Sequence, residues 1–135
     1  MILIGDIGNT DTKFCLLNKN YKIIKKIVFP TNKISQSSLK KNFNFLFKNN
    51  FFIKKSLFCS VVPKKYLLIK SFVQNNLKSQ CLELKKINLN KIMKINVNRK
   101  QIGSDRLANA LAVISKKKKS YNFGFWNSNN FRCCA

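Results

Sequence analysis

Acidic side chains are rare in this chain, and their positions single out two short polar motifs. Asp plus Glu total 4 against 27 Lys plus Arg, and three of the four acids fall in these motifs. The first motif is DIGNTDTK at residues 6–13. A carboxylate followed by a glycine-containing turn can present backbone N–H groups and the hydroxyls of Thr10 and Thr12 to phosphate oxygens. Asp6 can hold a hydrated Mg²⁺, and Lys13 can neutralise charge that develops on a transferred phosphoryl group.

The second motif is GSDRLANA at residues 103–110, which begins where an amphipathic helix is predicted to start. In this position Asp105 could accept the proton of a substrate hydroxyl. The planar guanidinium of Arg106 could bind a substrate carboxylate through two hydrogen bonds. The second motif therefore predicts an acid–base and anion-binding site.

Each motif also has a plainer interpretation. The first can be an ordinary hairpin turn in which Asn9 takes a left-handed conformation. In the second, Ser104 or Asp105 can simply cap the helix that follows. Taken alone, the first motif favours a functional site and the second favours the cap.

The elements that must position these motifs follow from hydrophobic patterning. Apolar runs bounded by turn residues predict strands, and apolar residues at helical spacing predict helices. The predicted strands cover residues 1–6, 13–17, 21–29, 56–62 and 80–84. The predicted helices cover residues 35–49, 66–77 and 104–117, and residues 85–102 are predicted to be irregular with at most one strand. Three strands followed by alternating helices and strands indicate an α/β domain with a mixed sheet.

Composition sets limits on the kind of protein and on its chemistry. The chain has 135 residues, enough for one ordinary domain, and 45% of them are hydrophobic, including 12 Phe, so a packed core is expected. Histidine is absent, which excludes His bases, Ser-His-Asp and Cys-His triads and His metal ligands. No dedicated metal-ligand set is predicted. No apolar run reaches the length of a membrane span, and the N-terminus does not resemble a signal peptide. Five Cys without a CxxC pair favour a reduced, cytoplasmic protein.

The net charge of +23 raises a second functional interpretation. A chain this basic is expected to bind nucleic acids non-specifically. The 24 Lys are scattered in pairs and only 3 Arg accompany them, so no single basic stripe with interleaved aromatics is formed. Specific nucleic-acid binding therefore stays an alternative to an enzyme.

Three separated segments together resemble the type III pantothenate kinase family. They are DIGNTDTK at residues 6–13, CSVVPK at residues 59–64 and IGSDRLANA at residues 102–110, and the resemblance covers residues 1–119. It implies an actin-like, RNase H-related ATPase fold of two domains, in a homodimer. It also implies ATP-dependent phosphorylation of pantothenate to 4′-phosphopantothenate, the first step of coenzyme A biosynthesis, with Mg²⁺ and a monovalent cation, potassium or ammonium. Some relatives are described as transcriptional accessory proteins. The alternative function is therefore that of a basic transcriptional accessory or nucleic-acid-binding protein.

The resemblance also assigns roles to individual residues. The segment similar to the family's ATP phosphate loop comprises Asp6, Ile7, Gly8, Asn9, Thr10, Asp11, Thr12 and Lys13. The segment similar to its pantothenate-binding GxDR motif comprises Gly103, Ser104, Asp105 and Arg106, and Asp105 matches the catalytic base. One departure is Asn96, which stands where the family often has a Tyr that contacts the substrate.

The sequence changes character after residue 119. Residues 120–135 contain no Lys, the single Trp and two adjacent Cys, at the place where the family begins its second domain with a DFGTATT phosphate motif. If residues 124–135 are back-translated with suitable codons and the first base is skipped, the new frame reads DFGTATTFDVV. We therefore expect a first domain over residues 1–119, and at residues 120–135 the start of a second domain read out of frame, the rest of which is missing. A chain broken in this way is expected to be inactive as a kinase.

Overall fold

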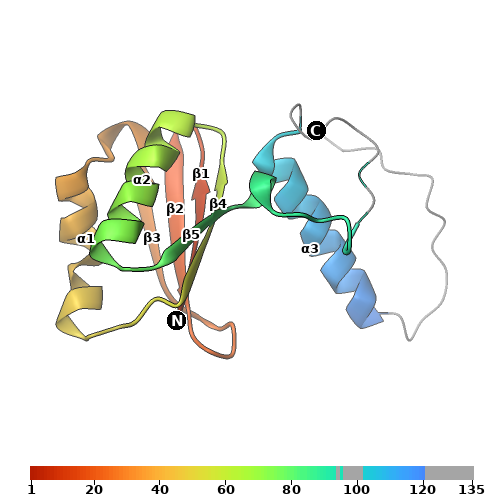
Figure 1. The fold of residues 1–135 in the computed structure, drawn as a ribbon, viewed down its shortest axis with the longest axis horizontal. Coiled ribbons are helices and arrows are strands. Elements are labelled where there is room, and N and C mark those ends of the chain that lie inside the picture. The colour runs from red at the N-terminus through yellow and green to blue at the C-terminus, as the bar shows by residue number, and fades with distance from the viewer. Residues whose placement is uncertain (94, 96–101, 121–135) are drawn as a thin grey trace.

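The computed structural model describes residues 1–93, 95 and 102–120, with side chains described as far as Ile114 in the last helix (Figure 1). The five strands are β1 (Ile2–Ile7), β2 (Asp11–Leu17), β3 (Ile23–Pro30), β4 (Lys55–Ser60) and β5 (Gln80–Glu83). The three α-helices are α1 (Gln36–Lys48), α2 (Pro63–Asn76) and α3 (Ser104–Ser120), and the two short 3₁₀ helices are η1 (Thr31–Lys33) and η2 (Leu84–Lys86). No helix in the described part is long and apolar enough to cross a membrane.

The strands form one mixed sheet in the order β3-β2-β1-β4-β5. Strands β1, β2 and β3 form an antiparallel meander, whereas β1 pairs with β4, and β4 with β5, in parallel. Parallel neighbours require crossover connections, and α1 and α2 occupy these connections. A meander followed by two parallel strands in this order is the arrangement of an RNase H-like domain, the building block of actin-like ATPases. The expected fold class is confirmed.

One face of the sheet holds the main core. Side chains of a strand alternate between its two faces, and the members directed to this face are packed beneath α1 and α2 (Figure 1). Phe14 lies at the centre, with ring centroids 5.1 Å from Phe43, 5.7 Å from Phe29 and 6.1 Å from Phe58, each in an edge-to-face arrangement. Such pairs add a stabilisation of about 1 kcal/mol beyond the area that they bury.

The opposite face of β4 packs against α3. Leu107 of α3, Leu84 of η2 and Leu89 form a second buried cluster, against which Leu57 and Cys59 of β4 are packed. Figure 1 shows α3 on the side of the sheet away from α1 and α2. The helix that carries the second motif is therefore attached to the sheet by its own small core.

The element boundaries agree with the sequence-based expectations to within three residues, and two of the differences fall at one junction. Strand β4 ends at Ser60 and not at residue 62, because the Val62 N–H donates to Ser60 Oγ (3.1 Å) and turns the chain. Helix α2 begins at Pro63, whose missing N–H costs nothing in the first turn of a helix, three residues earlier than predicted. Within residues 84–93 no strand is formed, and positions 94 and 96–101, including Asn96, lie outside the described residues.

Candidate functional site

The first motif forms the end of β1, a tight turn and the start of β2. Asp6 on β1 lies directly opposite Lys13 on β2, and the Gly8 N–H donates to the Asp11 carbonyl oxygen at 3.0 Å. A Cβ on Gly8 would stand 2.9 Å from that oxygen, so a larger residue would open the turn. Asn9 does not take the left-handed conformation of the hairpin interpretation.

The residues of this turn divide into an exposed and a buried set. The exposed set comprises Asp6, Asn9, Thr10, Asp11 and Lys13, and the side chains of Ile7 and Thr12 are fully buried.

The Thr12 hydroxyl lies 2.9 Å from the hydroxyl of Thr31, inside the domain. The expectation that the Thr12 hydroxyl faces phosphate oxygens is therefore wrong. The exposed members remain candidates for phosphate contact.

The second motif starts α3 in a different way from the expected cap. Ser104 is fully buried, and its hydroxyl donates to the backbone oxygen of Ser60 at the end of β4 (3.1 Å). The hydrogen bond that closes the first turn of the helix runs from the Leu107 N–H to the Gly103 carbonyl oxygen at 3.2 Å. The Ser104 side chain thus anchors the helix to the sheet, and its hydroxyl is not directed to a substrate.

Asp105 and Arg106 are exposed at the start of α3. The Asp105 carboxylate lies so close to Gly103 that a Cβ there would overlap its oxygen. Glycine at position 103 therefore leaves the carboxylate room to lie back over the turn. The proton acceptor and the anion-binding group predicted from the sequence are both at the surface, as that chemistry requires.

The two motifs meet at Cys59 of β4. Cys59 is the register partner of Asp6 in the parallel β1–β4 pair, and the next residue, Ser60, holds Ser104. Burial raises the pKa of the Cys59 thiol to about 11, and the nearby negative charges of Asp6 and Asp105 add to the shift. Two carboxylates that are 99 positions apart in sequence are therefore both near this thiol. The structure brings the catalytic and phosphate-binding candidates together at one end of the sheet.

The acidic side chains fit Mg²⁺ only in combination with a ligand. Among the described residues, no group of three or more Cys, Asp or Glu side chains could enclose a metal ion. Asp6 is exposed and forms no ion pair with another described side chain. Mg²⁺ commonly binds through one or two carboxylates together with substrate phosphates, and Asp6 suits that arrangement.

One contributing residue carries no signal in the sequence. Thr31, the first residue of η1, contacts the 8–11 turn through its backbone and its side chain. It follows Pro30 at the end of β3 and belongs to no recognisable motif, so only the tertiary contacts reveal it.

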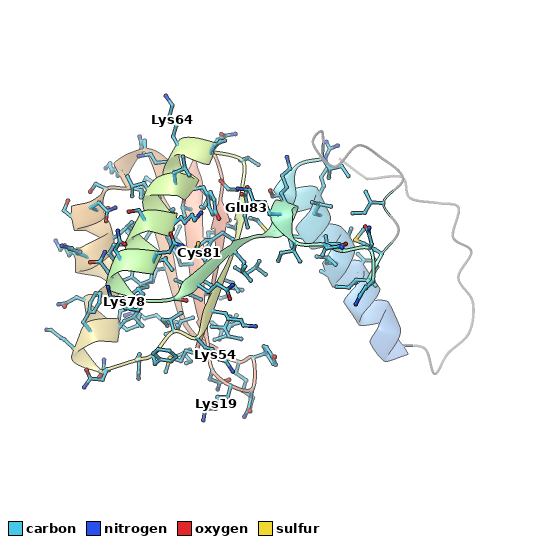
Figure 2. All side chains as sticks on the ribbon, viewed as in Figure 1. Lys19, Lys54, Lys64, Lys78, Cys81 and Glu83 are labelled. Carbon is cyan, nitrogen blue, oxygen red and sulfur yellow. The ribbon has the colours of Figure 1, made fainter. Side chains whose placement is uncertain are left out.

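The basic side chains are distributed over the whole domain. Figure 2 labels Lys64 at one end of the molecule and Lys19 and Lys54 near the other, all directed outward. No acidic cluster balances them in the described part of the chain, where Glu83 and Lys86 form an ion pair at 3.3 Å. This distribution is the one expected for non-specific attraction of anions.

Comparison with known proteins places the chain in a family. The family model for type III pantothenate kinases matches residues 2–122. A curated type III pantothenate kinase from Pelagibacter ubique (strain HTCC1062) is 51% identical over 131 residues, which are 97% of this chain and 53% of that protein. The chain therefore spans about half the length of this relative.

Among solved structures, the chain is similar to the activator of the 2-hydroxyisocaproyl-CoA dehydratase from Clostridium difficile with bound ADPNP. The TM-score is 0.48 and the sequence identity 9%, over 95% of this chain and 65% of that one. The family assignment rests on the sequence matches and on the three motifs. This chain belongs to the type III pantothenate kinase family.

Proposed function

We propose that this chain is the N-terminal part of an enzyme that transfers the γ-phosphoryl group of ATP to pantothenate, giving 4′-phosphopantothenate for coenzyme A biosynthesis. The observation that supports the proposal is that Asp6 and Asp105 are both near Cys59, so that the candidate phosphate-binding turn and the candidate proton acceptor share one end of the sheet. The family match and the 51% identical relative support the reaction. Nothing observed favours a specific nucleic-acid site.

The proposed reaction divides the work between the two motifs. Asp105 accepts the proton of the pantothenate hydroxyl as that oxygen bonds to the γ-phosphorus, and the bond from the γ-phosphorus to the bridging oxygen of ADP breaks. Arg106 holds the carboxylate of pantothenate through two hydrogen bonds, and Gly103 gives Asp105 room to move. Asp6 would hold Mg²⁺, which shields phosphate charge when bound, and Lys13 attracts the same phosphates.

The rest of the proposed enzyme lies in a second domain. We propose that residues 120–135 are read out of frame, so that DFGTATTFDVV is the true start of that domain. Residues 121–135 lie outside the described structure. The family model matches to residue 122, whereas the alignment with the curated relative covers 131 residues and extends beyond that position. A monovalent cation, potassium or ammonium, a homodimer and a cytoplasmic location complete the proposal.

The test compares two versions of the gene. The DNA from the codon of Lys119 onward is resequenced, and the protein is expressed both as given and with one base adjusted so that the DFGTATT frame continues. We expect ATP- and pantothenate-dependent formation of ADP and phosphopantothenate from the second version. Asp105→Asn should lower its turnover by about 10²- to 10⁴-fold. Glu83→Gln, which changes an acid away from the Asp6 turn, is the matched control and should retain turnover.

Two results would overturn the proposal. One is an adjusted-frame protein that folds but forms no phosphopantothenate with Mg²⁺ and either monovalent cation present. The other is an Asp105→Asn variant as active as Glu83→Gln. DNA affinity that is specific for sequence and insensitive to both substitutions would instead support the nucleic-acid alternative.

A further inference from the structure

Thr31 makes two hydrogen bonds with the turn that joins β1 to β2 and a third with Thr12 at the start of β2. Its backbone N–H donates to the Thr10 carbonyl oxygen at 2.7 Å, and its hydroxyl donates to the Gly8 carbonyl oxygen at 2.8 Å. The same hydroxyl oxygen lies 2.9 Å from the Thr12 hydroxyl. Thr31 is only 2% exposed, so water does not compete for these bonds.

The direction of the hydroxyl bonds follows from the number of available protons. A threonine hydroxyl has one proton to donate, and Thr31 gives it to Gly8. Thr12 must therefore be the donor in the Thr12–Thr31 pair. The resulting chain of donors runs from Thr12 through Thr31 to the Gly8 carbonyl group.

Both carbonyl groups that Thr31 binds, those of Gly8 and Thr10, are thereby directed into the domain. The backbone N–H groups of Asn9 and Thr10 donate to no acceptor among the described residues. Free N–H groups in a turn whose carbonyl groups face inward form an anion-binding concavity. The direction of these two N–H groups depends on the bonds that Thr31 makes with Gly8 and Thr10.

Thr31 is itself held in place from two helices. The ammonium group of Lys65, on α2, donates to the carbonyl oxygens of Asn32 (3.1 Å) and Ile34 (2.9 Å). Ser35, which follows, caps α1 through a capping box. The segment that carries Thr31 therefore joins the 8–11 turn to both helices of the main core.

We propose that Thr31 is a positioning residue that holds the 8–11 turn with the amides of Asn9 and Thr10 directed outward, toward the phosphate oxygens of a nucleotide. The nucleotide as ligand rests on the proposed function, and the control of the turn by Thr31 does not. Thr31 touches no substrate in this proposal and acts only through the turn.

The test uses the 135-residue chain and three variants. Thr31→Val keeps the shape and removes the hydroxyl, and Thr31→Ser restores it. Ser56→Ala is the matched control, because it also breaks a buried hydroxyl pair, with Ser79 at 2.9 Å, on the other edge of the core. Amide hydrogen exchange is followed at Gly8 and at Val61. The Val61 N–H donates to the Ile7 carbonyl oxygen at 3.0 Å and serves as an internal reference.

We expect Thr31→Val to speed exchange at Gly8 about tenfold more than at Val61, the effect of one lost hydrogen bond. Thr31→Ser should restore the wild-type ratio, and Ser56→Ala should change both amides equally. Equal acceleration of Gly8 and Val61 in Thr31→Val would overturn the proposal, because the hydroxyl would then contribute only global stability.

A titration with Mg²⁺–ATP separates this proposal from the proposed function. If the wild-type chain binds ATP, Thr31→Val should weaken binding about tenfold and Ser56→Ala should leave it unchanged. An unchanged affinity in Thr31→Val would also overturn the proposal. If the wild-type chain binds no ATP while the exchange result holds, nucleotide binding by this chain fails and the role of Thr31 in shaping the turn stands.

Discussion

Cys59 shows at the residue scale how two distant motifs affect one side chain. Its thiol is half-buried and lies near the negative charges of Asp6 and Asp105, and all three influences oppose loss of the proton. An ordinary thiol is already mostly protonated at physiological pH, and the raised pKa makes the thiolate rarer still. A third negative charge near the two carboxylates is thereby avoided.

Cys59 should therefore react slowly with alkylating agents. With the pKa at about 11 in place of 9.0, the thiolate fraction at pH 8 falls about a hundredfold, and alkylation of the folded chain should be slower than that of the urea-unfolded chain by that order. Asp6→Asn and Asp105→Asn should each speed the reaction, and Glu83→Gln should not. Mass spectrometry of the Cys59 peptide measures the rate. Equal rates in all three variants would show that the carboxylates do not converge there.

The raised pKa of Cys59 also determines whether the free energy of unfolding rises or falls with pH. Between about pH 9 and 11 the unfolded thiol has lost its proton while the folded thiol keeps it. The unfolded state binds fewer protons in this window, so the contribution of Cys59 to the free energy of unfolding decreases as the pH rises. Cys59→Ser should flatten the decrease in urea-unfolding curves. A slope that is the same in both proteins would contradict this prediction.

The exposed site residues could be predicted from the sequence, and the directions of the hydroxyl groups could not. Asp6, Lys13, Asp105 and Arg106 are charged residues in short polar motifs, and such side chains stay at the surface. The plainer interpretation of the second motif has Ser104 or Asp105 cap the helix, but the Ser104 hydroxyl donates to an acceptor in a residue 44 positions away. Local patterns hold no information about an acceptor so distant in sequence.

At the scale of elements, α3 depends on few contacts for its position on the sheet. The second buried cluster, which packs α3 on the sheet, is small. The hydrogen bond from Ser104 to Ser60 links the first residue of α3 to β4. Hydrophobic periodicity predicted the helix itself, since it is a local property, but the cluster that orients it includes partners from β4 and η2. The sequence therefore indicated which elements exist, and long-range packing determines how they meet.

Ser104→Ala should loosen the start of α3 without disturbing the main core. Loss of the bond leaves the Ser60 carbonyl oxygen without that buried donor and should lower the free energy of unfolding by about 1–3 kcal/mol. Amide exchange should accelerate at Leu107, whose N–H closes the first turn, more than in β1. Ser56→Ala again serves as the control. Equal acceleration in α3 and β1 would argue against a local anchor.

Gly5 in the middle of β1 marks a place where two elements meet closely. A Cβ at this position would stand 2.5 Å from the ring of Phe58, which is fully buried, and 3.4 Å from that of Phe14. Gly5→Ala should therefore cost about 1–3 kcal/mol of stability through overpacking. Urea unfolding measures the loss. The double variant with Phe58→Leu should recover part of it, and no recovery would place the cause elsewhere.

At the scale of the whole molecule, the net charge of +23 opposes compaction. The labelled Lys64 and Lys19 lie toward opposite ends of the domain, so the mutual repulsion of such lysines is spread over the surface (Figure 2). Salt should screen this repulsion and raise the thermal midpoint by about 5 °C between about 0.02 and 0.3 M NaCl. Changing Lys19, Lys54 and Lys64 to Glu lowers the net charge by 6, to +17, and should reduce the gain. A midpoint independent of salt in both proteins would contradict this prediction.

The placement of Thr31 next to the meander has a consequence for synthesis on the ribosome. The 8–11 turn and Thr31, which binds it, lie within the first 31 positions, whereas Asp105 is made 74 residues later. At about 5–20 residues per second this interval lasts roughly 4–15 s, far longer than hairpin formation. The hydrogen bonds between Thr31 and the turn can therefore form before Asp105 and the start of α3 are translated.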